Sequence, residues 1–71
     1  MFVKIVVSST YMNGPSMAGG QKLLVNDRHI QGLMDMDGRG TRVFTSFGTF
    51  DTLSPLSDVQ GQMDGSTVVD W

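Results

Sequence analysis

The sequence is almost without the residues that build long helices. All seven acidic residues are Asp, there is no Glu, and Ala18 is the only alanine. Helices are normally filled with Ala, Glu, Leu and Lys, so helix is expected to be a minority state. Nine Gly, two Pro and many Ser, Thr, Val and Phe residues are typical of strands joined by turns. The chain is therefore predicted to be mainly β.

The chain has the length of one small domain, residues 1–71. It contains no cysteine, which excludes disulfides, zinc–thiolate sites, iron–sulfur clusters and thiol nucleophiles. Five basic and seven acidic residues give a net charge of −2, so no nucleic-acid partner is expected. A core of this size supplies only about 3–5 kcal/mol, which favours a homo-oligomer as a further source of stability.

Apolar and β-branched runs between turn signals predict five or six strands. The first has Val3, Ile5 and Val7 on one face and Phe2 and Val6 on the other, which is usual for a strand that is central or covered by a partner. The predicted strands are residues 2–9, 22–25, 30–36, 41–46, 49–53 and 66–71, with a loop over 11–20, a turn or single helical turn over 26–29 and a hairpin connection over 37–40. The expected fold is a small antiparallel sheet or partly open barrel with one short helical turn.

That helical turn is predicted after Ser54-Pro55. Ser54 is expected as the N-cap and Pro55 as the first helical residue. Leu56 and Val59 would then point inward, and Gly61 would end the helix.

The N-terminal run MFVKIVV is followed at once by polar Ser8, Ser9 and Thr10, so it is too short for a signal peptide. No stretch approaches the ~18 apolar residues of a membrane span. We therefore expect a cytoplasmic protein with no membrane partner, located in the host cytoplasm if a phage encodes it.

Three patterns approach known functional motifs but lack essential residues. Residues 14–19 have the spacing of a phosphate-binding loop, yet the Lys and the Ser or Thr that should follow are missing. Residues 35–40 begin like a calcium loop without its closing Glu. His29 is the only histidine, whereas a catalytic zinc site normally needs three protein ligands. We expect no enzyme, no catalytic residue, no metal and no cofactor, and a weak hydrolase using His29 is the least favoured alternative.

Six methionines are the least ordinary feature of so short a chain. Met34 and Met36 share a predicted face with Ile30 and are expected in the core. Methionines in the predicted loop, beside an aromatic residue, are harder to bury and indicate an adaptable contact surface. A terminal Trp is likewise typical of an anchor at contacts. The predicted partner-binding residues are Tyr11, Met12, Met17 and Trp71.

A second hypothesis is a site for a small anionic ligand, such as a metabolite or a nucleotide, at a subunit interface. Basic side chains and backbone N–H groups of a glycine turn would bind its phosphate or carboxylate groups. The candidate residues are Gly19, Gly20, Lys22, Arg28, Arg39 and Arg42. A solvated surface is the alternative interpretation of these charges.

Between Leu23 and Val59 the chain follows a recognisable order: an apolar strand ending in Asn, an Ile, a short variable turn, a Thr-x-Val strand, a Gly, another strand and a Val. The matching residues are Asn26, Ile30, Thr41, Val43, Gly48 and Val59. With them, about half of the chain resembles the small flagellar motility proteins of the FlbD type and similar short phage and bacterial proteins of unknown role. An acidic residue and a Ser usually follow the last strand of that family, whereas here Leu53 leads into Ser54-Pro55. The resemblance implies a small β-meander and no specific activity.

The expected function is that of a non-catalytic binding or accessory protein of phage or bacterial origin. It would act through protein–protein contacts, as a homo-oligomer or on a host protein. A protein that sequesters a small anionic ligand and a virion decoration protein are the alternatives.

Overall fold

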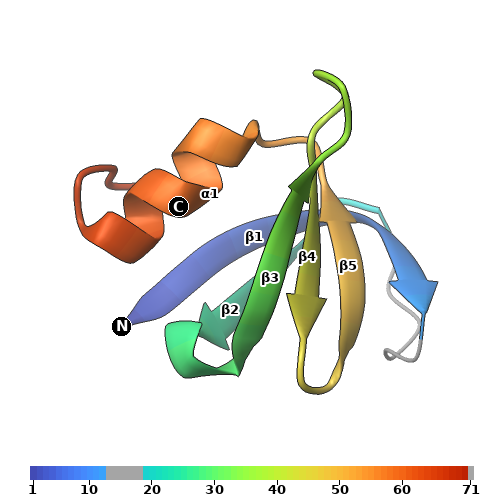
Figure 1. The fold of residues 1–71 in the computed structure, drawn as a ribbon, viewed down its shortest axis with the longest axis horizontal. Coiled ribbons are helices and arrows are strands. Elements are labelled where there is room, and N and C mark those ends of the chain that lie inside the picture. The colour runs from blue at the N-terminus through green and yellow to red at the C-terminus, as the bar shows by residue number, and fades with distance from the viewer. Residues whose placement is uncertain (13–18, 71) are drawn as a thin grey trace.

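The computed structural model describes residues 1–12 and 19–70, and only the backbone of Tyr11 and Met12. In chain order the elements are the strands β1 Phe2–Met12 and β2 Gln21–Asn26, the 3-10 turn η1 Asp27–His29, the strands β3 Ile30–Asp35, β4 Thr41–Thr45 and β5 Gly48–Thr52, and the helix α1 Leu56–Asp64 (Figure 1). The prediction of a mainly β fold with an antiparallel sheet and one short helix is confirmed. Strand ends differ from the predicted ones by a few residues, most at β1, which continues to Met12 where a loop was expected.

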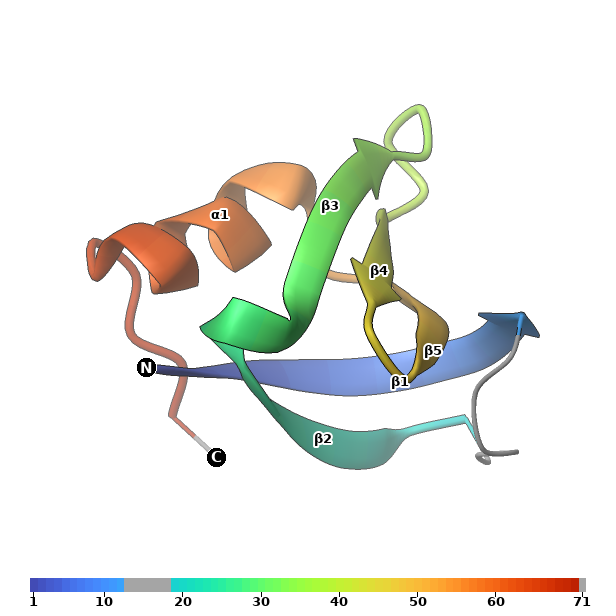
Figure 2. The same ribbon diagram turned by 60° about the horizontal axis from the view of Figure 1, so that its bottom comes forward.

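All five strands form one antiparallel sheet in the order β2-β1-β5-β4-β3. The long strand β1 is shared between two partners. Its first half pairs with β2, from Phe2 opposite Asn26 to Val7 opposite Gln21. Its second half pairs with β5, beginning at Val7 opposite Thr52 and continuing through two register shifts. Because β1 changes partner along its length, the sheet curls there, as Figure 2 shows.

The sheet stays open rather than closing into a barrel. Its two edge strands, β2 and β3, are consecutive in the chain and are joined only by η1. Asn26 caps this turn, because its Oδ1 accepts the Arg28 N–H at 3.2 Å, as expected for a helical turn at 26–29. In both ribbon views α1 lies beside β3 and over the first half of β1 (Figures 1 and 2). The helix thus covers the open side of the sheet.

The core lies between the curled sheet and α1. Alternate positions of the strands face inward, because successive side chains of a strand point to opposite faces. The buried apolar residues are Val3, Ile5, Val7, Val25, Val43, Phe50 and Val59, with Leu23, Ile30, Leu33 and Met63 packed against them. This is a small core, in keeping with the length of the chain.

Gln62 of α1 occupies the place of a missing strand beside β1. Its Nε2 donates to the Lys4 carbonyl at 2.9 Å, and its Oε1 accepts the Lys4 N–H at 2.8 Å. The side chain is almost fully buried. Backbone groups that are buried need partners, and here one amide side chain supplies both. This pair of bonds satisfies both backbone groups of Lys4 at the open edge of β1.

The ends of α1 differ from the sequence prediction. Pro55, not Ser54, is the N-cap, and no side chain caps the first turn. The helix also passes through Gly61 and ends at Gly65, so the prediction that Gly61 stops it is wrong. A Cβ at position 61 would collide with the Thr67 side chain, which folds back over the helix. Glycine is therefore required at 61 by close packing and not by a chain reversal.

The predicted last strand is wrong over residues 66–70, which form no strand. The N–H groups of Ser66 and Thr67 both donate to the Gly61 carbonyl, at 2.9 and 3.0 Å. Lys4 Nζ then donates to the Val69 carbonyl at 2.8 Å. The segment is bound to the end of α1 and to β1 by these contacts, so its backbone is not arranged for pairing with a strand. We call residues 66–70 the tail.

The prediction that Met34 and Met36 belong to the core is also wrong. Met34 is 42% exposed and Met36 is only half-buried. A register shift between Ile30 and Gly32 displaces the alternation of β3 by one residue. Ile30 and Leu33 therefore both pack on the core, and Met34 faces outward.

Candidate protein-binding surface

The four predicted partner-binding residues are not tested by this structure. Met17 and Trp71 lie outside the described residues, and so do the side chains of Tyr11 and Met12. The backbone of Met12 pairs with Thr49 at the end of β1. Their role in binding stays a prediction.

An apolar strip lies on the outer face of the paired strands β1 and β2. Phe2 and Val6 point away from the core on β1, because their neighbours Val3, Ile5 and Val7 point into it. These two side chains are 61% and 38% exposed.

Leu24 of β2 joins the two residues of β1. It lies directly opposite Lys4, so Phe2 and Val6 are its diagonal neighbours, a spacing that long side chains can bridge. Leu24 is 54% exposed. Phe2, Val6 and Leu24 therefore form one continuous surface, which we call the β1–β2 strip.

The polar residues that share this face carry positive charge. Lys4 lies between Phe2 and Val6 on β1, and Lys22 is opposite Val6 on β2. Asn26, opposite Phe2, is uncharged. No carboxylate occupies the outward positions of this strand pair, although the whole chain has a net charge of −2. The strip is thus apolar with a local excess of basic groups.

A hollow lies at each end of the strip. The larger, of about 300 Å³, is the tail groove, which separates the start of β1 from the tail. It is lined by Met1, Phe2, Lys4, Gln62, Gly65, Thr67, Val68 and Val69. The smaller, of about 130 Å³, lies between Val6 and Leu53, which follows β5. The apolar surface is therefore flanked by a hollow at each end.

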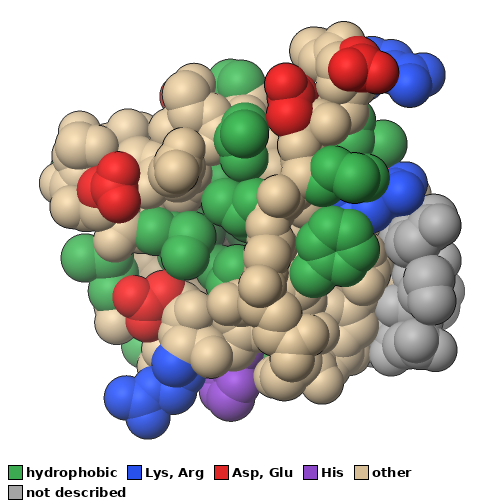
Figure 3. All heavy atoms as spheres, in the orientation of Figure 1, with side chains coloured by type: hydrophobic (Ala, Val, Ile, Leu, Met, Phe, Trp, Pro, Cys, Tyr) green, Lys and Arg blue, Asp and Glu red, His purple; other side chains and the backbone are tan. Residues whose placement is uncertain are grey.

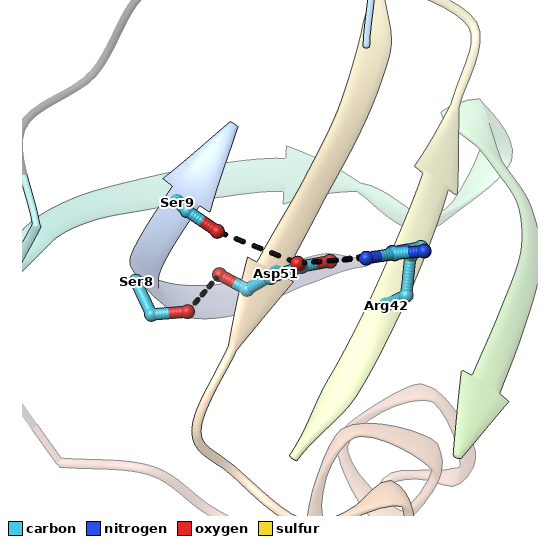
Figure 4. A network of polar contacts seen from close by, with 4 residues as sticks. All are labelled: Ser8, Ser9, Arg42 and Asp51. Atoms are coloured by element: carbon cyan, nitrogen blue, oxygen red, sulfur yellow. Dashed lines mark hydrogen bonds and ion pairs between the residues drawn. The ribbon is translucent and has the colours of Figure 1, made fainter. Parts of the chain in front are cut away.

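The outer face of β4 and β5 carries a polar network instead. Arg42 of β4 donates from Nε and from Nη2 to the Asp51 carboxylate, at 2.8 and 3.1 Å (Figure 4). Ser9 Oγ donates to the same carboxylate at 3.3 Å, and Ser8 Oγ donates to the Asp51 carbonyl at 3.0 Å. Both charged side chains are mostly buried. The network ties β1, β5 and β4 together across the sheet.

The residues predicted to bind an anion are spread over the fold. Arg28 in η1 and Arg39 in the β3–β4 turn lie at opposite ends of β3, roughly 20 Å apart for a strand of this length. Arg42 is paired with Asp51, and the Gly20 N–H donates to the Val7 carbonyl at 2.7 Å. Figure 3 shows the Lys and Arg side chains of one face at separate places on its rim. Gly19 and Lys22 lie beside the middle of β1 and do not join these arginines in one cluster.

His29 has polar and aromatic neighbours on the surface. Its Nδ1 lies 3.1 Å from Ser46 Oγ, and its ring meets the Phe47 ring edge-on at 6.2 Å. The side chain is exposed, and among the described residues no third group in this contact orients it for catalysis. Over the described residues no group of three or more His or Asp side chains is close enough to hold a metal ion.

Sequence reasoning recognised part of the strip. The first strand is apolar on both faces, and this pattern indicated that Phe2 and Val6 would be covered by a partner. Leu24 carried no such signal, because its face depends on the register with β1.

Comparison with known proteins adds no family to these observations. No family model, curated protein or solved structure matches the chain. The resemblance to flagellar motility proteins of the FlbD type stays a prediction. Within residues 1–12 and 19–70, no helix has the length and apolar character that crossing a membrane requires.

Proposed function

We propose that this protein is a non-catalytic binding protein that acts through the β1–β2 strip. The observation that supports the proposal is the continuity of three exposed apolar side chains on one face of a strand pair, with no carboxylate among the outward positions. Contiguous exposed apolar surface of this kind commonly marks a contact with another macromolecule.

The partner proposed first is a second copy of the same chain. Among the described residues the core has seven buried apolar side chains, which is small, and stacking two strips would bury further apolar surface in both copies. A standard interface covers about 800 Å² of each partner. That is near a fifth of the accessible surface of 4325 Å². The strip would form the apolar centre of this area, with Lys22 and Asn26 at its polar margin.

The test is the mass in solution, measured by light scattering after size exclusion over a concentration series. For the wild-type chain we expect a mass that is a multiple of 7.7 kDa, the mass of one copy. For Leu24→Ser we expect a shift toward the mass of one copy. Met34→Ser is the matched control, because Met34 is also an exposed apolar side chain on the outer face of an edge strand. A monomer at every concentration, or equal effects of the two substitutions, would contradict self-association through the strip.

Ionic strength distinguishes a second copy from an acidic partner. Two copies bring Lys4 and Lys22 of both chains into one interface, so salt should strengthen the association by screening their repulsion. An acidic protein partner would instead be released by salt. The mass of the purified chain, measured again in low and high salt, tests the first case: an association that high salt weakens would contradict a contact between two strips.

The proposal retains the expected cytoplasmic location and phage or bacterial origin. A host protein, or a coat protein in a decorated virion, would occupy the same strip as the alternative partner. The residues predicted to bind a small anionic ligand are dispersed over the fold. No single place in the described structure therefore favours such a site.

A further inference from the structure

We propose that Asp37, at the tip of the β3–β4 connection, is a modification site at which the folded chain isomerises to isoaspartate. This inference goes beyond the function proposed above and does not depend on it. It rests on the Asp37-Gly38 sequence, on the open surroundings of that link, and on the contrast with a second Asp-Gly link that the fold restrains.

The reaction needs only the chain and water. The Gly38 nitrogen attacks Cγ of the Asp37 carboxyl in its protonated form, and the carboxyl hydroxyl leaves as water with the hydrogen of that nitrogen. The product is a five-membered succinimide ring. Water then opens the ring at one of its two C–N bonds. Opening at Cγ restores aspartate, whereas opening at the main-chain carbonyl leaves Gly38 joined to Cγ, which is isoaspartate. One water leaves and one returns, so no oxidant or other co-reactant is consumed.

The sequence offers two places for this reaction. A side chain on the residue that follows Asp hinders the approach of its nitrogen, so glycine is the most permissive successor. Of the seven Asp residues, only Asp37 and Asp64 precede a glycine. The two links have the same composition, and the tertiary structure distinguishes them.

The link after Asp37 is held loosely. Both Asp37 and Gly38 are exposed, and Figure 1 shows their connection projecting beyond the sheet. A Cβ at position 38 would meet no atom within 4 Å, and the Gly38 N–H donates to Asp35 Oδ1 over a long 3.4 Å. Asp37 has a φ of +56°, in the left-handed region that is unfavourable for an L residue. Rotation of this link toward ring closure therefore breaks little structure.

The link after Asp64 is held firmly. Asp64 is the last residue of α1, and the Gly65 N–H donates to the Gln62 carbonyl at 3.2 Å and also to the Gly61 carbonyl. The next two N–H groups along the chain donate to the Gly61 carbonyl as well. Ring closure would have to release this group of bonds, so we expect the reaction at Asp64 to be slower than at Asp37 by about tenfold or more.

Isomerisation would alter the hairpin and create a group that an enzyme can recognise. It inserts one extra backbone carbon between Met36 and Gly40, whose N–H and carbonyl form a bond of 3.0 Å that closes the connection. The hairpin would be loosened as a result. It also leaves a free α-carboxylate at an exposed position. The enzymes that fit this product are methyltransferases that esterify the α-carboxylate of isoaspartate with S-adenosylmethionine as methyl donor.

The test follows the folded wild-type chain over several weeks at mildly acidic pH. Trypsin places Asp37 in the peptide 29–39 and Asp64 in the peptide 43–71. Isoaspartate leaves the mass unchanged but alters the chromatographic retention of a peptide, and electron-transfer fragmentation locates it. We expect it to accumulate in 29–39 at least about ten times faster than at Asp64. In the urea-unfolded chain the two rates should be similar, and a sample digested at the start corrects for conversion during handling.

A matched pair of substitutions repeats the comparison with a change in mass. Asp37→Asn and Asp64→Asn form the same ring with loss of ammonia, and water then converts the amide to an acid, which mass spectrometry detects. Asn tolerates a positive φ as Asp does. The natural Asn13-Gly14 link lies in a third peptide, 5–22, and does not interfere. We expect the faster conversion in Asp37→Asn.

Two results would overturn the proposal. One is an equal rate at positions 37 and 64 in the folded chain, either as Asp or as Asn. The other is an absence of isoaspartate at Asp37 in the folded chain after a time in which the unfolded chain has formed it.

Discussion

Removing the amide of Gln62 should destabilise the fold more than the loss of a single surface contact. Gln62→Met keeps the length and apolar stem of the side chain but leaves the Lys4 N–H and carbonyl without their partners at 2.8 and 2.9 Å. Each buried backbone group left unsatisfied costs about 1–3 kcal/mol. Water has little access, since Gln62 is 8% exposed. We therefore expect the free energy of unfolding to fall by about 2–4 kcal/mol.

Equilibrium unfolding in urea measures this loss directly. Gln60→Met is the matched control, because Gln60 lies on the same helix with an exposed side chain, and it should change stability by less than about 0.5 kcal/mol. If apolar burial alone held α1 to β1, Gln62→Met would be neutral or stabilising. Equal midpoints for the two variants would refute the argument that the amide replaces a strand.

The pH dependence of Gln62→Glu tests the same geometry. The introduced carboxyl can accept the Lys4 N–H when ionised, but it can donate to the Lys4 carbonyl only when protonated. Its pKa in the folded chain should therefore exceed the value of about 4.3 in the unfolded chain. A raised folded pKa means that stability is retained below about pH 4.3 and lost as the pH rises through the folded pKa. A variant whose loss relative to wild type is the same at acid and neutral pH would contradict this.

Two further predictions concern the hairpin and the sheet. Gly40→Ala should lower stability by at least about 2 kcal/mol more than Gly38→Ala in urea unfolding, or prevent folding. Both glycines have positive φ, +117° and +81°, but only at Gly40 would a Cβ collide with the Thr52 carbonyl oxygen. For Arg42 and Asp51, a double-mutant cycle with Arg42→Met and Asp51→Asn should give a coupling of about 1–2 kcal/mol, because the pair is bidentate and mostly buried. Additive effects would show that the ion pair contributes nothing.

Local chemistry explains the elements that were predicted correctly. The alternation of Val3, Ile5 and Val7 depends only on neighbouring residues, and so does the glycine-rich connection over 37–40. Asn26 also acts locally, since the N–H that its side chain accepts is two residues away. Such features can be recognised without knowledge of the fold.

The errors arose where a distant segment decides the outcome. Gly61 is of a residue type that commonly ends a helix, but here the helix continues through it. Glycine is needed at this position because the Thr67 side chain packs where a Cβ of residue 61 would lie. Met34 has the right residue type for the core, but a register shift against β4 turns it outward. The residues next to Gly61 and Met34 in the sequence do not indicate either of these contacts.

The sequence by itself determined that this protein is mainly β, with a short helix after Pro55 and a first strand that is apolar on both faces. Those properties follow from side-chain size, branching and alternation along the chain. Only the tertiary structure decided that β1 divides its pairing between β2 and β5, and that Gln62 completes its open edge. It also placed Leu24 beside Phe2 and Val6 to form the β1–β2 strip. Register and packing between distant segments are collective properties, so no single stretch of the sequence contains them.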